Sequence, residues 1–467
     1  MQKKIIFLTI ESVKRELNSK ILLALKALKR NYRVVIGQKG ALRELIKDTN
    51  PGIMMLKSFG PGNTAHINFI KKRNYKIVSG DEELITAMDF EDKIEWRMNN
   101  ENVEKLDLLL AVGETSDYPV MQHKFHSLLN KVLLCGNIRL ELLKKKYRPL
   151  LEKDSQLMKQ KFGDYILLLT AFAKINKTRE NFQIDFVYNR IVEGNVDPES
   201  YHIHLANEQV KMQRDILLQT LKFINNFEKN FPNKKLVISP HQNEKFNFWQ
   251  NYINKRKFKN IIINTDMHSS SYPLINSAEL LISFNSTSLL EAFFLEKKTI
   301  NLLGKKERES EIDVLKKVSK VVRSSDELCE EISNFYNNKH KITENNQLKE
   351  VRNFDQKFDS FEIILNNFDN FKDLKFFNSI YKNNYYLFLN KLRTLKNSFK
   401  KILSKLLKKN SMIFRFHNEK IGTRLRKDNF IKNVKFINSF EKVNKLKIKQ
   451  LAPEVFLLDS QHNYHNK

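Results

Sequence analysis

The chain has 467 residues, of which 41% are hydrophobic and 29% charged, and its formal net charge is +29. This composition is ordinary for a folded protein, and the length allows about two to three domains. No window reaches the roughly 18 consecutive apolar residues that a membrane-spanning helix needs. The two cysteines, Cys135 and Cys329, lack the spacing of a metal site or a disulfide framework, which fits a reducing cytoplasm.

The first 140 residues alternate short apolar runs with helical patterns. The first run, Ile5 to Ile10, is ended by Glu11 and predicts a strand rather than a signal peptide. Strands are expected at 4–10, 32–37, 52–58, 75–80, 106–113 and 131–136, and helices at 14–30, 40–48, 62–73 and 116–128. Strands separated by single helices indicate βαβ units and a parallel sheet.

A charged helical stretch at 141–162 is typical of a linker, and a second alternating series follows it. Strands are expected at 165–171, 235–240, 260–265, 280–283 and 299–303, and helices at about 207–230, 244–256, 286–296 and 326–337. The stretch 174–206 fits a loop or an insertion. We therefore expect an α/β protein with two Rossmann-like, doubly wound domains, at 1–140 and 163–345, and ligand binding in the cleft between them. This arrangement resembles that of GT-B glycosyltransferases.

The remaining segment, 346–467, is expected to be a basic, mostly helical tail. From Phe371 onward it carries 23 Lys and Arg against 6 Asp and Glu. One apolar stripe at helical spacing runs through it: Phe388, Leu392, Leu395, Phe399, Ile402 and Leu406. The stripe fits a helix packed on the body or a coiled coil first, and a basic amphipathic helix on an anionic membrane surface second. Nucleic acid is the weakest candidate partner, because no recognised binding motif accompanies the charge.

Acidic side chains follow the strand expected at 75–80. Asp81, Glu82 and Glu83 come directly after it, where a general base facing the cleft belongs. Repulsion among them would raise one pKa toward the useful range. The alternative is an ordinary acidic helix start, which the helix dipole favours.

Two further groups follow strands in the second domain. His241 comes after Pro240 and is either a donor to a phosphate oxygen or a surface histidine in a turn. A run of hydroxyl side chains lies between an expected strand and the helix that follows it: Ser286, Thr287 and Ser288. These residues either cap the helix N-terminus or bind a phosphate group there, an arrangement we call the phosphate seat. Neither group has metal-ligand spacing, so we expect metal-independent chemistry without a cofactor.

Four stretches together resemble the bacterial surface carbohydrate biosynthesis proteins, GT-B-like enzymes of capsule or lipopolysaccharide assembly. They are "VKRELNSKILLALKALKRNYRVVIGQKGAL", "SGDEEL", "GNIRLELL" (136–143) and "NSTSLLEA" (285–292), and the similarity covers about residues 3–340. The same positions resemble the motifs of bacterial sialyl-, polysialyl- and Kdo-transferases. The resemblance implies that Glu82 and Glu83 hold the acid positions, His241 the donor-phosphate histidine, and Ser286 with Thr287 the hydroxyl pair.

The resemblance also implies that Glu291 binds a donor ribose. Three positions depart from the motifs: Leu84 replaces a Gly, Gln242 a Pro, and Ser239 an Arg that often precedes the histidine. The expected function is an inverting glycosyl transfer from a nucleotide-activated sugar, with a CMP-linked sugar as one candidate donor, to a glycan or lipid-linked acceptor. The expected location is the cytoplasmic face of the plasma membrane. Glycerol- or ribitol-phosphate transfer, and non-catalytic binding of a nucleotide or glycan, remain alternatives.

Overall fold

The structure is a computed structural model that describes residues 3–82, 98, 100–176, 201–266, 270–339, 348–371, 374, 392, 395–396, 399 and 425–460. The chain divides into two compact units. The first contains Met1–Leu84, Glu95–Leu142 and Lys349–Lys467, and the second contains Ile85–Ile94 and Leu143–Leu348.

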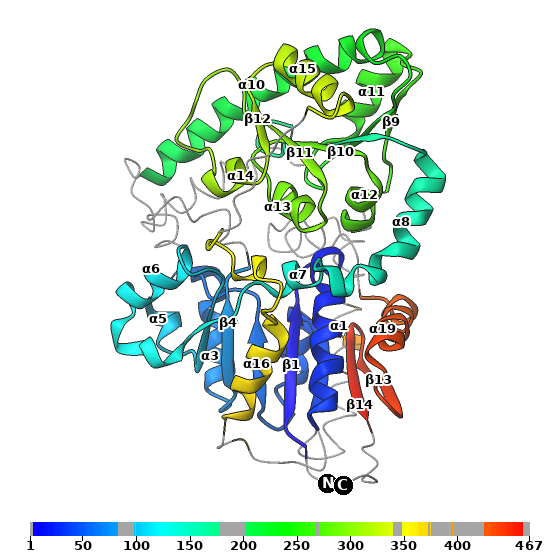
Figure 1. The fold of residues 1–467 in the computed structure, drawn as a ribbon. Helices are drawn as coiled ribbons and strands as arrows, with labels where there is room; N and C mark the ends of the chain where they lie inside the picture. The colour runs from blue at the N-terminus through cyan, green and yellow to red at the C-terminus, as the bar shows by residue number, and fades with distance from the viewer. Residues whose placement is uncertain are drawn as a thin grey trace. The chain divides into compact units, whose positions relative to one another are not determined.

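The first unit is built on a sheet with strand order β13-β14-β2-β1-β3-β4-β5-β6 (Figure 1). Its parallel strands are β1 (Ile5–Ile10), β2 (Arg33–Gln38), β3 (Ile53–Leu56), β4 (Lys76–Gly80), β5 (Leu108–Ala111) and β6 (Val132–Leu134). Every residue of β1 is buried, which explains its continuous apolar run, because helices cover both faces of a parallel sheet. The strands expected in this half are confirmed within a few residues.

Helices connect these strands, and the longest of them is α1 (Val13–Lys29). The others are α2 (Lys39–Leu45), η1 (Pro61–Asn63), α3 (Thr64–Lys71), α5 (Asn100–Val103), α6 (Asp117–Lys124), η3 (His126–Lys131) and α7 (Ile138–Glu141). The face of α1 that carries Leu17, Ile21, Leu25 and Leu28 is buried, as its apolar spacing predicts.

The C-terminal residues belong to the first unit and are not uniformly helical, which corrects the expected helical tail. Strands β13 (Leu446–Ala452) and β14 (Val455–Ser460) form an antiparallel hairpin, and β14 pairs with the edge strand β2. Helix α19 (Lys427–Glu441) contacts α1. The sequence analysis missed the hairpin because Lys447 and Lys449 alternate with apolar residues on an exposed edge strand and look like basic tail.

Residues 348–371 also join the first unit, through η5 (Arg352–Phe354) and α16 (Ser360–Asp369). The guanidinium of Arg30 pairs with Glu362 and, at 2.8 Å, with Asp369, whose carboxylate also accepts the hydroxyl of Tyr32 at 2.7 Å. Of the apolar stripe, Leu392, Leu395 and Phe399 are helical and exposed, at 44%, 66% and 67%. Phe388, Ile402 and Leu406 lie outside the described residues.

The second unit has a parallel sheet with strand order β12-β11-β10-β7-β8-β9. The strands are β7 (Ile166–Leu169), β8 (Leu236–Ser239), β9 (Ile261–Ile263), β10 (Leu280–Ser283), β11 (Lys298–Leu302) and β12 (Lys320–Val322). The sequence analysis expected all of them except β12, which has only three residues. The chain reverses direction across the sheet between β7 and β10, which makes that position the topological switch point.

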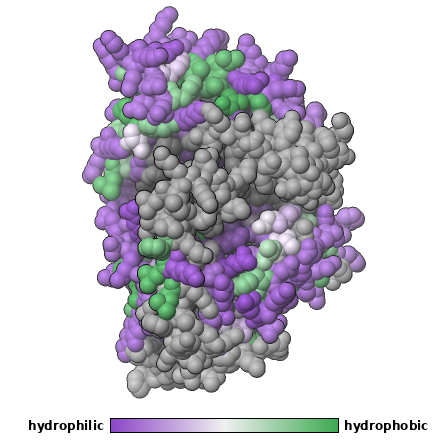
Figure 2. All heavy atoms as spheres, turned by 180° about the vertical axis from the view of Figure 1, so that it is seen from behind, coloured by the Kyte–Doolittle hydropathy of each residue, from purple (hydrophilic) through white to green (hydrophobic). Residues whose placement is uncertain are grey.

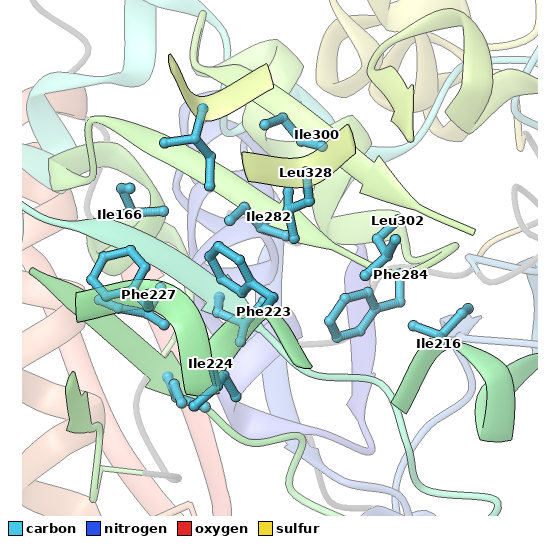
Figure 3. Packing of buried hydrophobic residues seen from close by; sticks show 14 of the residues in the cluster. Ile166, Ile216, Phe223, Ile224, Phe227, Ile282, Phe284, Ile300, Leu302 and Leu328 are labelled. Atoms are coloured by element: carbon cyan, nitrogen blue, oxygen red, sulfur yellow. The ribbon is translucent and has the colours of Figure 1, made fainter. Parts of the chain in front are cut away.

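The helices of the second unit are η4 (Lys145–Tyr147), α8 (Pro149–Phe162), α10 (Tyr201–Asn230), α11 (Phe246–Arg256), α12 (Tyr272–Ser277), α13 (Thr287–Phe294), α14 (Asp313–Lys317) and α15 (Ser325–Tyr336). Alternate strand residues such as Ile166, Ile282 and Leu302 form one core with α10, α11 and α15 (Figure 3). Phe223 and Phe227 of α10 and Leu328 of α15 are fully or almost fully buried in it. These side chains bury one face of the sheet against the helices.

Hydrophilic side chains make up most of the coloured surface in Figure 2. No helix among the described residues is both long and apolar enough to cross a membrane.

Candidate functional site

His241 stands at the carboxyl end of β8 in an exposed turn. Its backbone N–H donates to Thr170 Oγ1 at 3.2 Å, which ties it to the residue that follows β7. Its Nδ1 accepts the backbone N–H of Asn243 at 3.2 Å. Because Nδ1 accepts this hydrogen bond, the neutral ring carries its proton on Nε2 and can donate a hydrogen bond from that atom.

The hydroxyl cluster stands at the carboxyl end of β10, and part of it caps α13. Ser286 is the N-cap, and its Oγ accepts the Ser288 N–H at 3.4 Å. Ser288 Oγ lies 3.1 Å from Ser286 Oγ and 3.0 Å from Ser283 Oγ. Thr287 is half-buried and begins the helix. The capping interpretation is therefore confirmed, and the phosphate seat stays a prediction that the same first-turn N–H groups allow.

The structure brings His241 and the hydroxyl cluster to the same edge of one sheet. Strands β8 and β10 both pair with β7, so their ends lie about 10 Å apart. Ser283 Oγ donates to the carbonyl of Leu169, the last residue of β7, at 3.1 Å. Both groups are thus fixed to the end of β7 at the switch point, where open α/β sheets bind ligands.

Asn285 shapes the turn that carries the hydroxyl cluster, and the sequence analysis did not identify it. Its φ of 45° lies in the left-handed region, which Asn tolerates better than most residues. Its N–H donates to Asn301 Oδ1 at 2.9 Å. Its side chain donates to the carbonyl of Ser310 at 2.7 Å and accepts the N–H of Ile312 at 2.9 Å. An Asn immediately before the Ser-Thr-Ser run was the available signal.

Glu291 lies on α13, one turn after the hydroxyl cluster, and only 6% of it is exposed. Its role as a ribose ligand remains a prediction.

In the first unit, Asp81 and Glu82 directly follow β4, as expected, and Glu83 lies outside the described residues. Asp81 is buried. The side chain of Glu82 is 10% exposed, and its Oε1 lies 3.2 Å from Nζ of the fully buried Lys20 on α1. Its Oε2 is buried and accepts no hydrogen bond within the described part of the chain. Glu82 Oε2 therefore has lone pairs that no described residue uses.

The electrostatics around Glu82 differ from the expected repulsion. Burial alone would raise the pKa of Glu82, but the positive charges of Lys20, Arg139 and Lys57 together lower it. The raised pKa belongs instead to Glu16 on α1, because that carboxyl is buried and lies in the field of Glu82. Glu82 is therefore an ionised carboxylate at neutral pH, able to accept a proton but a weaker base than expected.

Lys57, whose charge helps to lower the pKa of Glu82, belongs to a group of charged residues at the ends of neighbouring strands. Glu11, after β1, lies 3.5 Å from the ammonium of Lys39, after β2, and 3.8 Å from that of Lys57, after β3. Glu16 accepts the N–H groups of Glu11 and Ser12 at 3.0 and 3.1 Å and so closes the start of α1. No sequence signal joins these residues, because they come from separate segments that only the sheet brings together.

Among the described residues, no group of three or more His, Cys, Asp or Glu side chains is arranged to hold a metal ion. The acid belongs to the first unit, and His241 and the hydroxyl cluster belong to the second.

No protein-family model and no curated protein sequence matches the chain. Its fold is similar to the UDP-GlcNAc 2-epimerase of Methanocaldococcus jannaschii, solved with UDP-GlcNAc and UDP. That match has a TM-score of 0.51 and 14% identity, over 79% of this chain and 99% of that one. A putative UDP-N-acetylglucosamine 2-epimerase from Listeria monocytogenes matches at a TM-score of 0.51 and 11% identity, over 80% of this chain and 99% of that one.

The wall teichoic acid polymerase TagF gives a weaker match, at a TM-score of 0.45 and 12% identity, over 79% of this chain and 88% of that one. At these identities the epimerase matches establish the fold alone. The chain is an α/β protein with two Rossmann-like units in a GT-B-like arrangement of elements.

Proposed function

We propose that this protein is a metal-independent, inverting glycosyltransferase that uses a nucleotide-activated sugar in the synthesis of a bacterial surface polysaccharide. The observation that carries the proposal is the placement of His241 and the Ser286–Ser288 hydroxyls around the end of β7 at a switch point. A CMP-linked sugar is the first donor to test.

The donor half of the reaction belongs to the second unit. The N–H groups at the start of α13 and the hydroxyls of Ser286 and Thr287 hold the phosphate of the donor. The Nε2–H of His241 donates to a phosphate oxygen and stabilises the charge that develops as the nucleotide leaves. Glu291 binds the ribose.

The acceptor half belongs to the first unit. The carboxylate of Glu82, or that of Glu83, takes the proton of the acceptor hydroxyl. The acceptor oxygen then bonds to the anomeric carbon while the bond from that carbon to the phosphate oxygen breaks, which inverts the centre. The unused lone pairs of Glu82 Oε2 support this role, because that buried oxygen accepts no hydrogen bond in the described part of the chain.

Three other activities fit a nucleotide site on this fold, and their products differ. Epimerisation, the activity named for the two similar structures, returns a nucleotide sugar without transfer. Glycerol- or ribitol-phosphate transfer makes a phosphodiester in place of a glycosidic bond. A non-catalytic homologue binds a nucleotide and makes no product. Mass spectrometry of reactions with a lipid-linked acceptor and either a nucleotide sugar or CDP-glycerol separates the two transfers from each other. Proton NMR of the recovered nucleotide sugar separates epimerisation, which leaves the mass unchanged, from binding without turnover.

A matched pair of serines tests the phosphate seat. Ser286 caps α13, and Ser324 caps α15 in the same unit, where its Oγ accepts the Glu327 N–H at 3.2 Å. Each change to Ala removes one cap and costs about 1 kcal/mol of stability. Thermal-shift titrations with CMP, CDP, UDP and GDP should show weaker binding in Ser286→Ala only. Equal nucleotide responses in the two variants would contradict the proposal.

We place the enzyme at the cytoplasmic face of the plasma membrane, held by residues 372–424. This segment has 14 Lys and Arg against 2 Asp and Glu. Of its described apolar side chains, Leu374 is buried, and Leu392, Leu395 and Phe399 are exposed. Basic charge beside an exposed apolar stripe suits an anionic lipid surface. Flotation of the full chain with phosphatidylglycerol vesicles, and none with neutral vesicles, is the expected result. Salt-sensitive binding to an oligonucleotide in place of vesicles would favour nucleic acid instead.

A further inference from the structure

Glu244 is a buried acid in the second unit that the proposed reaction does not use. It lies three residues after His241, and none of its surface is exposed. Its Oε1 accepts the Thr170 hydroxyl at 2.7 Å and the Phe172 N–H at 2.8 Å. Its Oε2 accepts the indole N–H of Trp249 at 2.8 Å. Burial raises the pKa of this carboxyl, and the donated hydrogen bonds oppose that effect.

Thr170 joins this carboxylate to the turn that carries His241. The Thr170 hydroxyl donates a hydrogen bond to Glu244 and accepts one from the backbone N–H of His241 at 3.2 Å. The backbone N–H of Glu244 donates to the His241 carbonyl at 2.8 Å. Both peptide groups of His241 are therefore held by the same pair of residues.

The hydroxyl cluster rests on the same support. Phe172, which follows β7, has its ring 4.9 Å from that of Phe284, which follows β10, and 5.9 Å from the indole of Trp249 on α11. Phe284 and Ser283 directly precede the turn of Ser286, and Ser283 is bonded to the end of β7. One buried layer thus underlies the loops after β7, β8 and β10.

We propose that Glu244 is a positioning residue. Through Thr170, Glu244 fixes the backbone of His241 against the end of β7. The distance between the imidazole and the Ser286 turn is thereby set to fit one phosphate group bound over the end of β7. The assignment to a phosphate rests on the proposed function, whereas the fixing of His241 does not. Glu244 itself touches neither substrate, because its oxygens are occupied and buried.

Two substitutions at Thr170 separate the hydrogen bond from the packing. Thr170→Val keeps the shape and loses the hydroxyl, which leaves the His241 N–H and Glu244 Oε1 without their shared partner. Thr170→Ser keeps the hydroxyl and is the matched control. Glu244→Gln turns one oxygen into an NH₂ group that faces the Trp249 N–H, and adding Trp249→Phe removes that opposing donor.

The first measurement needs no nucleotide: it is the hydrogen-exchange rate of the His241 amide in the full chain. We expect Thr170→Val and Glu244→Gln to exchange at least tenfold faster than wild type. Thr170→Ser should stay near wild type, and Glu244→Gln/Trp249→Phe should recover part of the protection. Unchanged exchange in Thr170→Val would overturn the positioning role.

The second measurement is nucleotide affinity by calorimetry, with CMP, CDP, UDP and GDP as probes. Thr170→Val should weaken binding about tenfold in the wild-type background and not at all in a His241→Ala background, because both changes remove the same contact. Equal weakening in both backgrounds would overturn the link to His241. A wild-type chain that binds none of the four would refute the proposed function and the phosphate assignment, while the exchange rates would still decide the positioning of His241.

Discussion

Lys20→Met tests whether the buried charges of the first unit hold Glu82 in its ionised form. The ammonium of Lys20 is fully excluded from solvent and lies 3.2 Å from Glu82 Oε1. Methionine has a similar length and no charge, so the variant keeps most of the packing and leaves Glu82 buried beside fewer cations. Removing one partner of a buried ion pair is costly, because the remaining charge stays desolvated.

Protonation of Glu82 limits this cost. A glutamate whose ordinary pKa is 4.5 can take a proton at pH 7 for about 3.4 kcal/mol, at roughly 1.36 kcal/mol per pH unit. We therefore expect Lys20→Met to lose up to about 3 kcal/mol of folding stability at pH 7. The loss should shrink as the pH falls to 4.5, where protonating Glu82 in the variant becomes free, and should reach zero only below the lowered pKa of wild-type Glu82. In the wild type, the lowered pKa of Glu82 contributes folding stability above pH 4.5, and this contribution is lost on further acidification.

Hydrogen exchange at increasing urea concentration, in peptides from residues 5–28 at pH 5, 6 and 7, reports the stability of this unit alone. That choice matters because a chain of two units need not unfold in one step. Lys26→Met is the control on the same helix: its partner Glu362, at 3.1 Å, is 43% exposed, so the expected loss is below about 1 kcal/mol. A loss in Lys20→Met that is independent of pH, or as small as that in Lys26→Met, would refute the reasoning.

Three further predictions concern the first unit. Burial raises the pKa of Asp117 from 3.8 to about 6, although the hydrogen bonds from Gly113 and Val112 act to lower it. The protonated carboxyl therefore contributes to folding stability at low pH, and this contribution is lost as the pH rises through 6. Between pH 4 and pH 7, the wild type should therefore lose about 3 kcal/mol of folding stability relative to Asp117→Asn, which is measured as a fall in its melting temperature. Parallel plots of melting temperature against pH for the two proteins would contradict this. Gly113→Ala places a Cβ 1.9 Å from the carbonyl oxygen of Glu350 and should cost about 1–3 kcal/mol in thermal unfolding, whereas Gly62→Ala, with nothing within 4 Å, should not. Deleting 425–467 uncovers the β2 edge and should give aggregates on size exclusion. Replacing 372–424 by a Gly/Ser linker of equal length should instead leave a monodisperse chain that no longer floats with anionic vesicles. A monodisperse 425–467 deletion would show that the hairpin is dispensable.

The parallel strands of both sheets, except β12, were predictable because parallel strands are buried on both faces. Runs such as Ile5 to Ile10 and Leu280 to Ile282 are continuously apolar, and the helices between them keep a 3.6-residue period. The same local logic placed Glu82, His241 and Ser286 at strand ends, which is where the structure has them. The N-cap at Ser286 followed from residue type alone.

Features that depend on distant segments could not be predicted this way. Lys20 and Glu82 are 62 positions apart, and only the packing of α1 against the end of β4 brings them to 3.2 Å. This contact, rather than repulsion within the acidic run, sets the pKa of Glu82. The hairpin at 446–460 was hidden for a similar reason: its edge strand is half-exposed and rich in Lys, so its pairing depends on β2 rather than on its own pattern.

By itself, the sequence determined the buried parallel strands except β12, the helices between them and the polar residues that follow them, because burial and capping depend on local periodicity and residue type. Tertiary structure alone decided that Thr170 and Glu244 support His241, that Lys20 keeps Glu82 charged, and that the C-terminal hairpin completes the first sheet. These outcomes depend on distances between segments far apart in the chain, and such distances are fixed by strand order and packing rather than by any local signal.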